Sequence, residues 1–156
     1  MSDMFGRSEW VRPKAWKLDW ELRKDGQVIA TMSSPKLFGT AVSATFGEDV
    51  YALRKGGLRR PGAVIKKLRD EGELAVLEFD TIGKGTIMVG PSSYQWERIE
   101  ASERWTLSQE GRGVIFTVDR DTKSKYPIGK VDVDIGDPHL APLLLLTWFI
   151  VSTSGC

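Results

Sequence analysis

Seven Lys and Arg residues, with no Asp or Glu among them, lie in one short stretch from Arg54 to Arg69. Arginine holds phosphate oxygens through two parallel hydrogen bonds, and lysine adds a point charge. The expected site for an anion or a lipid headgroup consists of Arg54, Lys55, Arg59, Arg60 and Lys66. The alternative is a solvated basic hairpin, because adjacent strand residues such as Lys66 and Lys67 point to opposite faces and do not act together.

Acidic residues gather later in the chain, and the candidate metal ligands are Asp119, Asp121, Asp132 and Asp134. Several carboxylate oxygens are what a hard cation such as Ca²⁺ binds, so these residues could form a calcium site. The segment 119–130 lacks the central glycine and the final glutamate of an EF-hand loop, and it contains three lysines that repel a cation. The alternative is that the carboxylates face solvent and protect strand edges.

Ser, Thr, Asp and Glu are plentiful, but the sequence shows none of the common catalytic motifs. The chain has one histidine, His139, and one cysteine, Cys156, which excludes a cysteine-rich or histidine-cluster metal site within one chain. It also lacks a nucleophile elbow, a phosphate-binding loop and a zinc-protease motif. His139 lies close to Asp137, where we expect it to cap or pack at a helix start. We therefore expect a protein that is not an enzyme and needs no cofactor.

The length and net charge of the chain limit the classes of protein to which it can belong. A chain of 156 residues suits one domain, 1–156, and 22 basic against 21 acidic residues leave a net charge of +1. Such a charge gives no overall attraction to nucleic acid. Trp16 and Trp20, which could stack on bases, lie on an apolar strand face and are expected in the core.

Neither end of the sequence predicts a membrane-spanning or secreted protein. Residues 1–13 contain no apolar run of the kind found in signal peptides. The longest apolar run, Leu140–Val151, is shorter than the roughly 20 residues that a spanning helix needs. We expect a cytoplasmic protein, either free or peripheral to a membrane.

Alternating apolar and polar residues recur along most of the chain. Trp16 to Arg23 alternate with a period of two, and Asp25-Gly26 after them predicts a tight hairpin. The pattern repeats about every ten residues and gives about eleven strands, as is typical of a barrel or sandwich. The predicted strands are 16–23, 27–31, 37–46, 49–55, 63–70, 74–80, 86–89, 94–100, 104–109, 114–120 and 130–135, and a further short strand at 9–12 makes twelve.

The end of the chain predicts the only helix. Asp137 is a suitable N-cap and Pro138 suits the first helical position, although Pro142 also permits a later start. From Leu143 to Val151 the residues are apolar except for one threonine, and a helix with no polar face must be enclosed on all sides.

These patterns together predict a mainly β protein. Fifteen helical residues would span roughly 22 Å, about the height of a small barrel. We therefore expect a closed twelve-stranded antiparallel β-barrel that encloses a central hydrophobic C-terminal α-helix. The side chains expected to be almost wholly buried are Leu144, Leu145, Trp148 and Phe149.

Particular residues also resemble a known family. The last third contains Val118-Asp119-Arg120-Asp121, Tyr126-Pro127, Val131-Asp132-Val133-Asp134 and the apolar run Leu143–Val151. Together with Asp25-Gly26, Tyr51-Ala52-Leu53-Arg54 and Tyr94-Gln95-Trp96, these segments are similar to the tubby C-terminal-like superfamily, which includes phospholipid scramblases and plant LURP-one-related proteins.

The resemblance implies a fold and two kinds of ligand. The fold is a twelve-stranded barrel around the C-terminal helix. Some tubby proteins hold a phosphoinositide headgroup on a basic cluster at the side of the barrel, and the acidic segment of scramblases has been proposed as a calcium site. The proline-rich and cysteine-rich segments typical of scramblases have no counterpart here, so a stand-alone member of the superfamily fits better than a lipid scramblase.

Taken together, the sequence favours a non-enzymatic binding module that recognises anionic, phosphoinositide-like lipid headgroups through its basic segment. The alternatives are an inert scaffold or protein-interaction domain, and a Ca²⁺-responsive scramblase-like lipid protein.

Overall fold

Twelve strands precede a single helix in the part of the chain that the structure describes. The structure is a computed structural model, and it describes residues 4–13, 19–33, 41–56, 61–70, 72–81, 83–100, 102–121 and 128–153. The elements are β1 Gly6–Val11, β2 Trp20–Lys24, β3 Gln27–Met32, β4 Ala41–Phe46, β5 Asp49–Lys55, β6 Gly62–Lys67, β7 Ala75–Thr81, β8 Lys84–Val89, β9 Ser92–Arg98, β10 Arg104–Gln109, β11 Gly113–Asp121, β12 Ile128–Val133 and α1 Leu140–Thr153.

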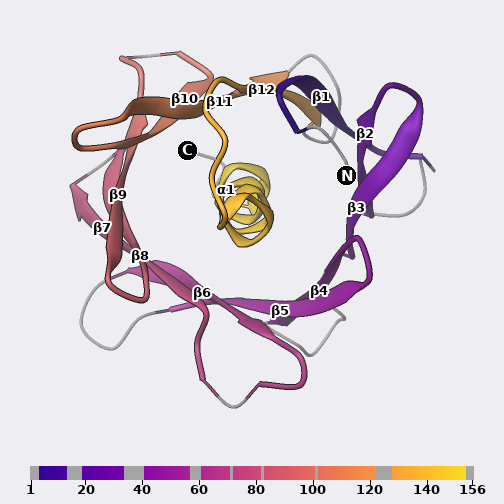
Figure 1. The fold of residues 1–156 in the computed structure, drawn as a ribbon, viewed down its shortest axis with the longest axis horizontal. Coiled ribbons are helices and arrows are strands. Elements are labelled where there is room, and N and C mark those ends of the chain that lie inside the picture. The colour runs from indigo at the N-terminus through magenta and orange to yellow at the C-terminus, as the bar shows by residue number, and fades with distance from the viewer. Residues whose placement is uncertain are drawn as a thin grey trace.

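The strands form one closed antiparallel barrel, as the sequence predicts. Each strand pairs with its neighbours in chain order, and β1 closes the ring by pairing with both β2 and β12. Figure 1, which looks down the barrel, shows the wall as a continuous ring with α1 at its centre. Each of the described strands has a neighbouring strand on both sides, which is how a barrel avoids edge-to-edge association.

Local sequence explains why these segments form strands and hairpins. In β8 and β12 the side chains alternate between buried and more exposed positions, so one face of each strand lies against the core. Asp25 and Gly26 have φ angles of 51° and 79°, and they connect β2 to β3 in the predicted hairpin. A turn with two positive φ angles matches the twist of its flanking strands.

Helix α1 begins near the predicted position. The Asp137 carboxylate accepts a hydrogen bond of 2.7 Å from the backbone N–H of His139, so Asp137 caps the turn that leads into the helix. Regular helix starts at Leu140, after a turn at Pro138 and His139. Pro142 lies in the first helical turn, where its missing N–H would have no intrahelical partner.

The helix fills the barrel and forms the centre of the core. Leu144, Leu145, Trp148 and Phe149 are at most 2% exposed, which confirms the prediction for all of them. Thr147, the polar residue among them, satisfies its buried hydroxyl by donating to the carbonyl of Leu143 at 2.8 Å. The inward-facing residues of the wall and the helix belong to one hydrophobic cluster.

Tryptophans pack where the C-terminal half of the helix meets the wall. The ring of Trp148 stacks on Trp10 at a centroid distance of 5.5 Å, and Trp20 meets it edge-on at 6.3 Å. Trp20 is 6% exposed, so its predicted place in the core is confirmed, whereas Trp16 lies outside the described residues. A Cβ at Gly129 would lie 2.6 Å from Trp148, so only glycine lets the wall approach the indole this closely.

Strand ends differ from the predicted ones where turn geometry prevails over residue type. The predicted strand 63–70 ends at Lys67, because Leu68 and Arg69 form a turn in which the Asp70 N–H donates to the Lys67 carbonyl at 3.1 Å. The predicted strand 130–135 is shifted to Ile128–Val133, since the chain must bend after Val133 to enter the helix.

Candidate functional site

Two of the five residues predicted to hold an anion lie on one face of the barrel wall. Arg54 on β5 pairs with Val64 on β6, and Ala52 pairs with Lys66. Tyr51 and Leu53, the alternate residues of β5, are 3% and 0% exposed in the core. Because successive strand residues point to opposite faces, Arg54 and Lys66 project from the outer surface.

The other predicted anion-binding residues do not join them in the structure as described. Lys55 adjoins Arg54 in β5 and is therefore directed to the opposite face of the strand, where it pairs with Ala63 of β6. Arg59 and Arg60 lie outside the described residues. Lys67 likewise alternates with Lys66 and pairs with Tyr51, as the solvated-hairpin alternative requires. The five residues are thus not one cluster on a common face.

Uncharged side chains complete the outer face of β5 and β6. Arg54 lies beside Val64, and Lys66 lies beside Ala52. The N–H of Leu68 donates to the carbonyl of Val50 at 3.0 Å, which extends the pairing by one residue. The outer β5–β6 face therefore consists of Val50, Ala52, Arg54, Val64, Lys66 and Leu68.

Acidic groups border this face rather than lying on it. The guanidinium of Arg54 contacts the Glu73 carboxylate at 3.3 Å, and both side chains are about half exposed. At the end of the strands, the ammonium of Lys67 lies 3.9 Å from the Asp49 carboxylate. Exposed pairs of this kind contribute about 0–1 kcal/mol, so an incoming anion can displace Glu73 at low cost.

Two of the four predicted calcium ligands, Asp119 and Asp132, form ion pairs with arginines. Asp119 accepts a hydrogen bond of 2.7 Å from Arg104, and this contact raises the pKa of Arg104. Asp132 accepts one of 3.3 Å from Arg7. Across the described ranges of the chain, no group of three or more His, Cys, Asp and Glu residues is arranged to hold a metal ion. Asp121 and Asp134 are exposed and form no such group with them.

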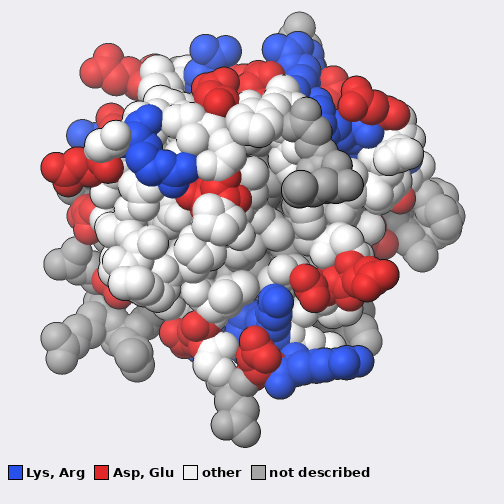
Figure 2. Space-filling view, in the orientation of Figure 1, with Lys and Arg blue, Asp and Glu red and all other residues white. Residues whose placement is uncertain are grey.

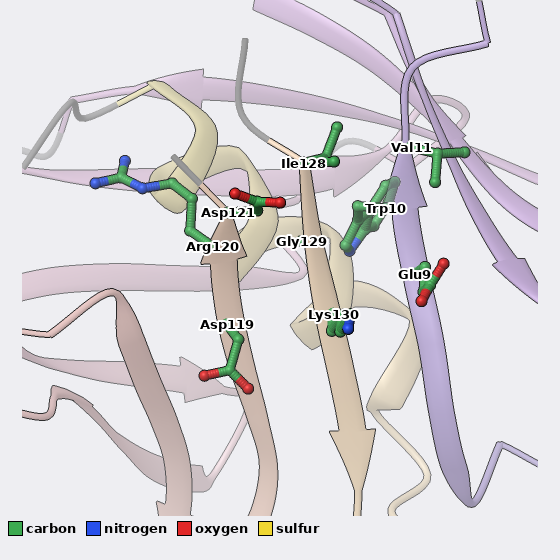
Figure 3. Close-up of a pocket in the computed structure, with 9 residues that line it drawn as sticks. All are labelled: Glu9, Trp10, Val11, Asp119, Arg120, Asp121, Ile128, Gly129 and Lys130. Carbon is green, nitrogen blue, oxygen red and sulfur yellow. The ribbon is translucent and has the colours of Figure 1, made fainter. Parts of the chain in front are cut away.

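A pocket of about 290 Å³ lies where β1, β11 and β12 meet, and sequence reasoning missed it. Its lining residues are Glu9, Trp10, Val11, Asp119, Arg120, Asp121, Ile128, Gly129 and Lys130. Figure 3 shows the indole of Trp10 between β1 and β12, with Arg120 directed away from it. The one signal in the sequence is Gly129, which lies just before the predicted strand 130–135, because a glycine in or beside a strand often marks a close backbone approach.

The charges around this pocket are mixed. Glu9, Asp119 and Asp121 contribute carboxylates, while Lys130 contributes an ammonium group on the neighbouring strand. Three carboxylates at one rim oppose the entry of an anion. In the face of the barrel shown in Figure 2, Lys and Arg side chains are likewise interspersed with Asp and Glu. The acid-free outer β5–β6 face is therefore better suited to an anionic group.

The single histidine belongs to a hydrogen-bonded network at the start of the helix. The Asp137 carboxylate, only 1% exposed, accepts hydrogen bonds from Arg112 at 2.6 Å and from the Tyr94 hydroxyl at 3.0 Å. The ring Nδ1 of His139 lies 3.2 Å from the same hydroxyl. Burial by itself raises the pKa of Asp137, but hydrogen bonds from Arg112, the His139 N–H and Tyr94 outweigh it and lower the pKa. The network anchors the helix start to β9 and to the β10–β11 turn.

Alkaline unfolding tests this network. Burial, together with the hydrogen bond and charge of Asp137, raises the pKa of Tyr94 to about 12. An unfolded tyrosine has a pKa of about 10, so the folded chain retains a proton that the unfolded chain releases. The resulting stability is complete below pH 10 and is lost as pH rises to 12. We expect Tyr94→Phe to reduce the loss of unfolding free energy over this range, measured by urea denaturation.

The matched control for that experiment is Tyr51→Phe, because burial and then Asp49 raise the pKa of Tyr51 as well. The part of the alkaline loss of unfolding free energy that comes from Tyr51 should therefore remain in Tyr94→Phe, and Tyr51→Phe should remove that part alone. Equal pH dependence in the wild type and Tyr94→Phe would contradict the Tyr94 assignment.

Comparison with known proteins gives no match to this chain: neither a family model, nor a curated protein, nor a solved structure matches it. In the part of the chain that the structure describes, no helix is long and apolar enough to cross a membrane. The functional argument therefore proceeds from the geometry of the barrel surface.

Proposed function

We propose that this protein is a non-enzymatic binding module that takes an anionic headgroup on the outer β5–β6 face. The observation that carries the proposal is that Arg54 and Lys66 project from the same face of paired strands. The described stretches 50–56 and 61–69 hold five Lys and Arg residues and no Asp or Glu. Arg54 can offer two parallel N–H donors to a phosphate, and Lys66 adds charge two residues further along the face.

The filled barrel interior supports binding at the outside. Trp148 and Leu145 are 0% exposed, and the helix that carries them is enclosed by the wall. A ligand inside the barrel would have to displace this helix from the core. The outer wall is the part of the fold that can take a ligand without loss of packing.

Two further observations support the proposal. A closed twelve-stranded barrel around one helix is the architecture that the resemblance to the tubby C-terminal-like superfamily implies. His139, the sole histidine, lies in the network around the buried Asp137 and Tyr94, where its neighbours serve to cap the helix. Neither the barrel architecture nor the contacts of His139 require that the protein catalyse a reaction.

Substitution of the two outward cations is the direct test. We expect Arg54→Gln together with Lys66→Gln to weaken binding of inositol trisphosphate roughly thirtyfold, since each basic group near an anionic surface contributes about 1 kcal/mol. Binding should also weaken as salt rises, because the Debye length falls to about 10 Å at 0.1 M. Isothermal titration calorimetry at low and at higher salt gives both quantities.

The matched control removes two exposed cations elsewhere, by Arg23→Gln and Lys130→Gln, and should leave the affinity within a few-fold. Conversely, Glu73→Gln should tighten binding, because it frees Arg54 from its ion pair at 3.3 Å. Equal weakening by both double variants would show a non-specific charge effect and contradict the site. Absence of wild-type binding at low salt would leave the scaffold alternative.

A second variant covers the part of the basic segment outside the described residues. Replacing Arg59 and Arg60 by Ala tests the sequence-based expectation that they share the anion with Arg54. If they do, binding to anionic vesicles should be abolished while thermal stability changes little, because exposed charges each contribute about 0–1 kcal/mol.

A further inference from the structure

Two exposed apolar side chains lie side by side where β5 begins and β6 ends. Leu68 is 61% exposed, more than any other large hydrophobic residue among those described, and Val50 is 38% exposed. The carbonyl of Val50 accepts the N–H of Leu68 at 3.0 Å, so the two residues are neighbours across the strands. Turns usually contain Gly, Pro, Asn, Asp or Ser, and neither packing nor turn geometry explains a leucine directly after β6.

This apolar pair lies on a surface that another molecule can reach. Figure 1 shows that the β6–β7 connection, which starts at Leu68, projects outward from the wall. On the adjacent strands the uncharged row continues with Thr45, which pairs with Val50. It then reaches Thr31, whose hydroxyl lies 2.6 Å from that of Thr45. The apolar pair is therefore the projecting part of an uncharged row across β3 to β6.

Charges of opposite sign lie on opposite sides of the pair. Glu48 comes two residues before Val50 in the chain, and Lys66 comes two residues before Leu68. Because β5 and β6 are antiparallel, these two charges lie in opposite directions from the pair. A strand rises about 3.3 Å per residue, which puts each charge roughly 7 Å away along the strands. Within the described ranges neither Glu48 nor Lys66 belongs to an ion pair.

A two-fold axis through the apolar pair makes this surface complementary to itself. Half a turn about such an axis sets Val50 of one copy against Leu68 of the other, and the reverse. The same rotation brings Glu48 of each copy opposite Lys66 of the other, so two ion pairs flank the apolar centre. An isologous interface needs this self-complementarity, and an apolar centre with a charged rim is the usual anatomy of protein interfaces.

The neighbouring charges disfavour other occupants. An anionic bilayer or a nucleic acid would meet the carboxylates of Glu48 and Asp70, and a strongly basic partner would meet Arg69 as well as Lys66. Two further pairs of opposite charge neutralise each other nearby, namely Lys67 with Asp49 and Arg54 with Glu73. A surface that carries both signs in balance is best complemented by a copy of itself in the opposite direction.

We propose that Val50 and Leu68 form the centre of a two-fold interface between two copies of this chain, with Glu48 of each copy bound to Lys66 of the other. The apolar centre consists of two side chains from each copy, so the dimer is of the small and weak class. The proposal goes beyond anion binding and does not depend on it. Because both would use Lys66, a bound anion and the second copy compete for the same ammonium group.

Sedimentation equilibrium of the full chain tests the apolar centre. We expect the wild type to dimerise with a dissociation constant below about 1 mM. Leu68→Ser should raise this constant at least about tenfold, because the burial of a leucine side chain is lost on both copies. Met88→Ser is the matched control, since Met88 is 43% exposed on β8, outside the proposed interface.

Charge reversal tests the ion pairs. Glu48→Lys and Lys66→Glu, each made singly, should abolish the dimer, because each sets two like charges against each other on both sides of the axis. Both substitutions in one chain restore the opposite signs, and the dimer should return. Glu100→Lys is the matched control, since Glu100 is exposed and follows β9 at the opposite end of the barrel.

Several results would overturn the proposal. A wild type that stays monomeric up to about 1 mM has no such interface. A dimer that survives Leu68→Ser, or that Met88→Ser weakens equally, does not have Leu68 at its centre. A double charge variant as weak as the single ones would show that Glu48 and Lys66 do not meet. Because sedimentation uses no added anion, each of these results leaves the anion site to its own test.

Discussion

Replacing Leu145 by Ala is expected to lower the free energy of unfolding by about 2–5 kcal/mol. Leu145 is 0% exposed and belongs to the single hydrophobic cluster inside the barrel. The wall around it is closed by strand pairing on every side, so it cannot collapse readily into the cavity that the substitution leaves. Equilibrium denaturation in urea measures the difference.

The control for this experiment is Val28→Ala, because Val28 is 48% exposed and its truncation leaves no internal cavity. We expect its effect to stay within about 0.5 kcal/mol. Deletion of residues 137–156 is the stronger form of the test and should leave insoluble protein, since the barrel interior would be empty. A soluble, folded truncation would contradict the central role of the helix.

Replacing Arg120 by Ala is expected to cost about 2–4 kcal/mol, the second large effect, because it removes charged hydrogen bonds and an aromatic contact. The Arg120 side chain is 7% exposed. It donates to the carbonyl of Val151 in the last turn of α1 at 2.8 Å and to Glu103 at 2.8 Å. Its guanidinium also lies 5.2 Å from the ring centroid of Trp105.

These contacts join the end of the helix to the barrel wall. A cation near the last turn satisfies helix carbonyls that have no intrahelical partner and complements the helix dipole. Arg7→Ala is the matched control, because Arg7 is paired with Asp132 but its side chain is 60% exposed. Such a pair contributes about 0–1 kcal/mol. If the two substitutions had equal effects in thermal or urea denaturation, Arg120 would not be the contact that fixes the helix end.

Much of the fold could be predicted because it depends on residues close together in the chain. The alternation of apolar residues gave the strands, and Asp25-Gly26 gave a hairpin because both residues accept positive φ angles. The apolar sequence from Leu143 to Val151 required an enclosed helix. These are local properties of a few neighbouring residues.

The candidate site could be predicted only in part. The basic composition of the segment from Arg54 to Arg69 is visible in the sequence. The register decides that Arg54 and Lys66 share a face whereas Lys55 faces the other way. It also brings Glu73 to Arg54 across 19 residues of chain. The predicted strand 63–70 concealed Leu68, because its exposure follows from a turn that begins after Lys67.

The sequence by itself thus determined the period of each strand, the enclosed helix and the presence of a basic segment. Only the tertiary structure decided which distant side chains meet: Arg120 with the carbonyl of Val151, Asp119 with Arg104, and Trp148 beneath Gly129. The physical reason is that periodicity and turn preference arise from neighbours along the chain. Partners across the barrel, by contrast, depend on the register of every strand pair and on the closure of the ring.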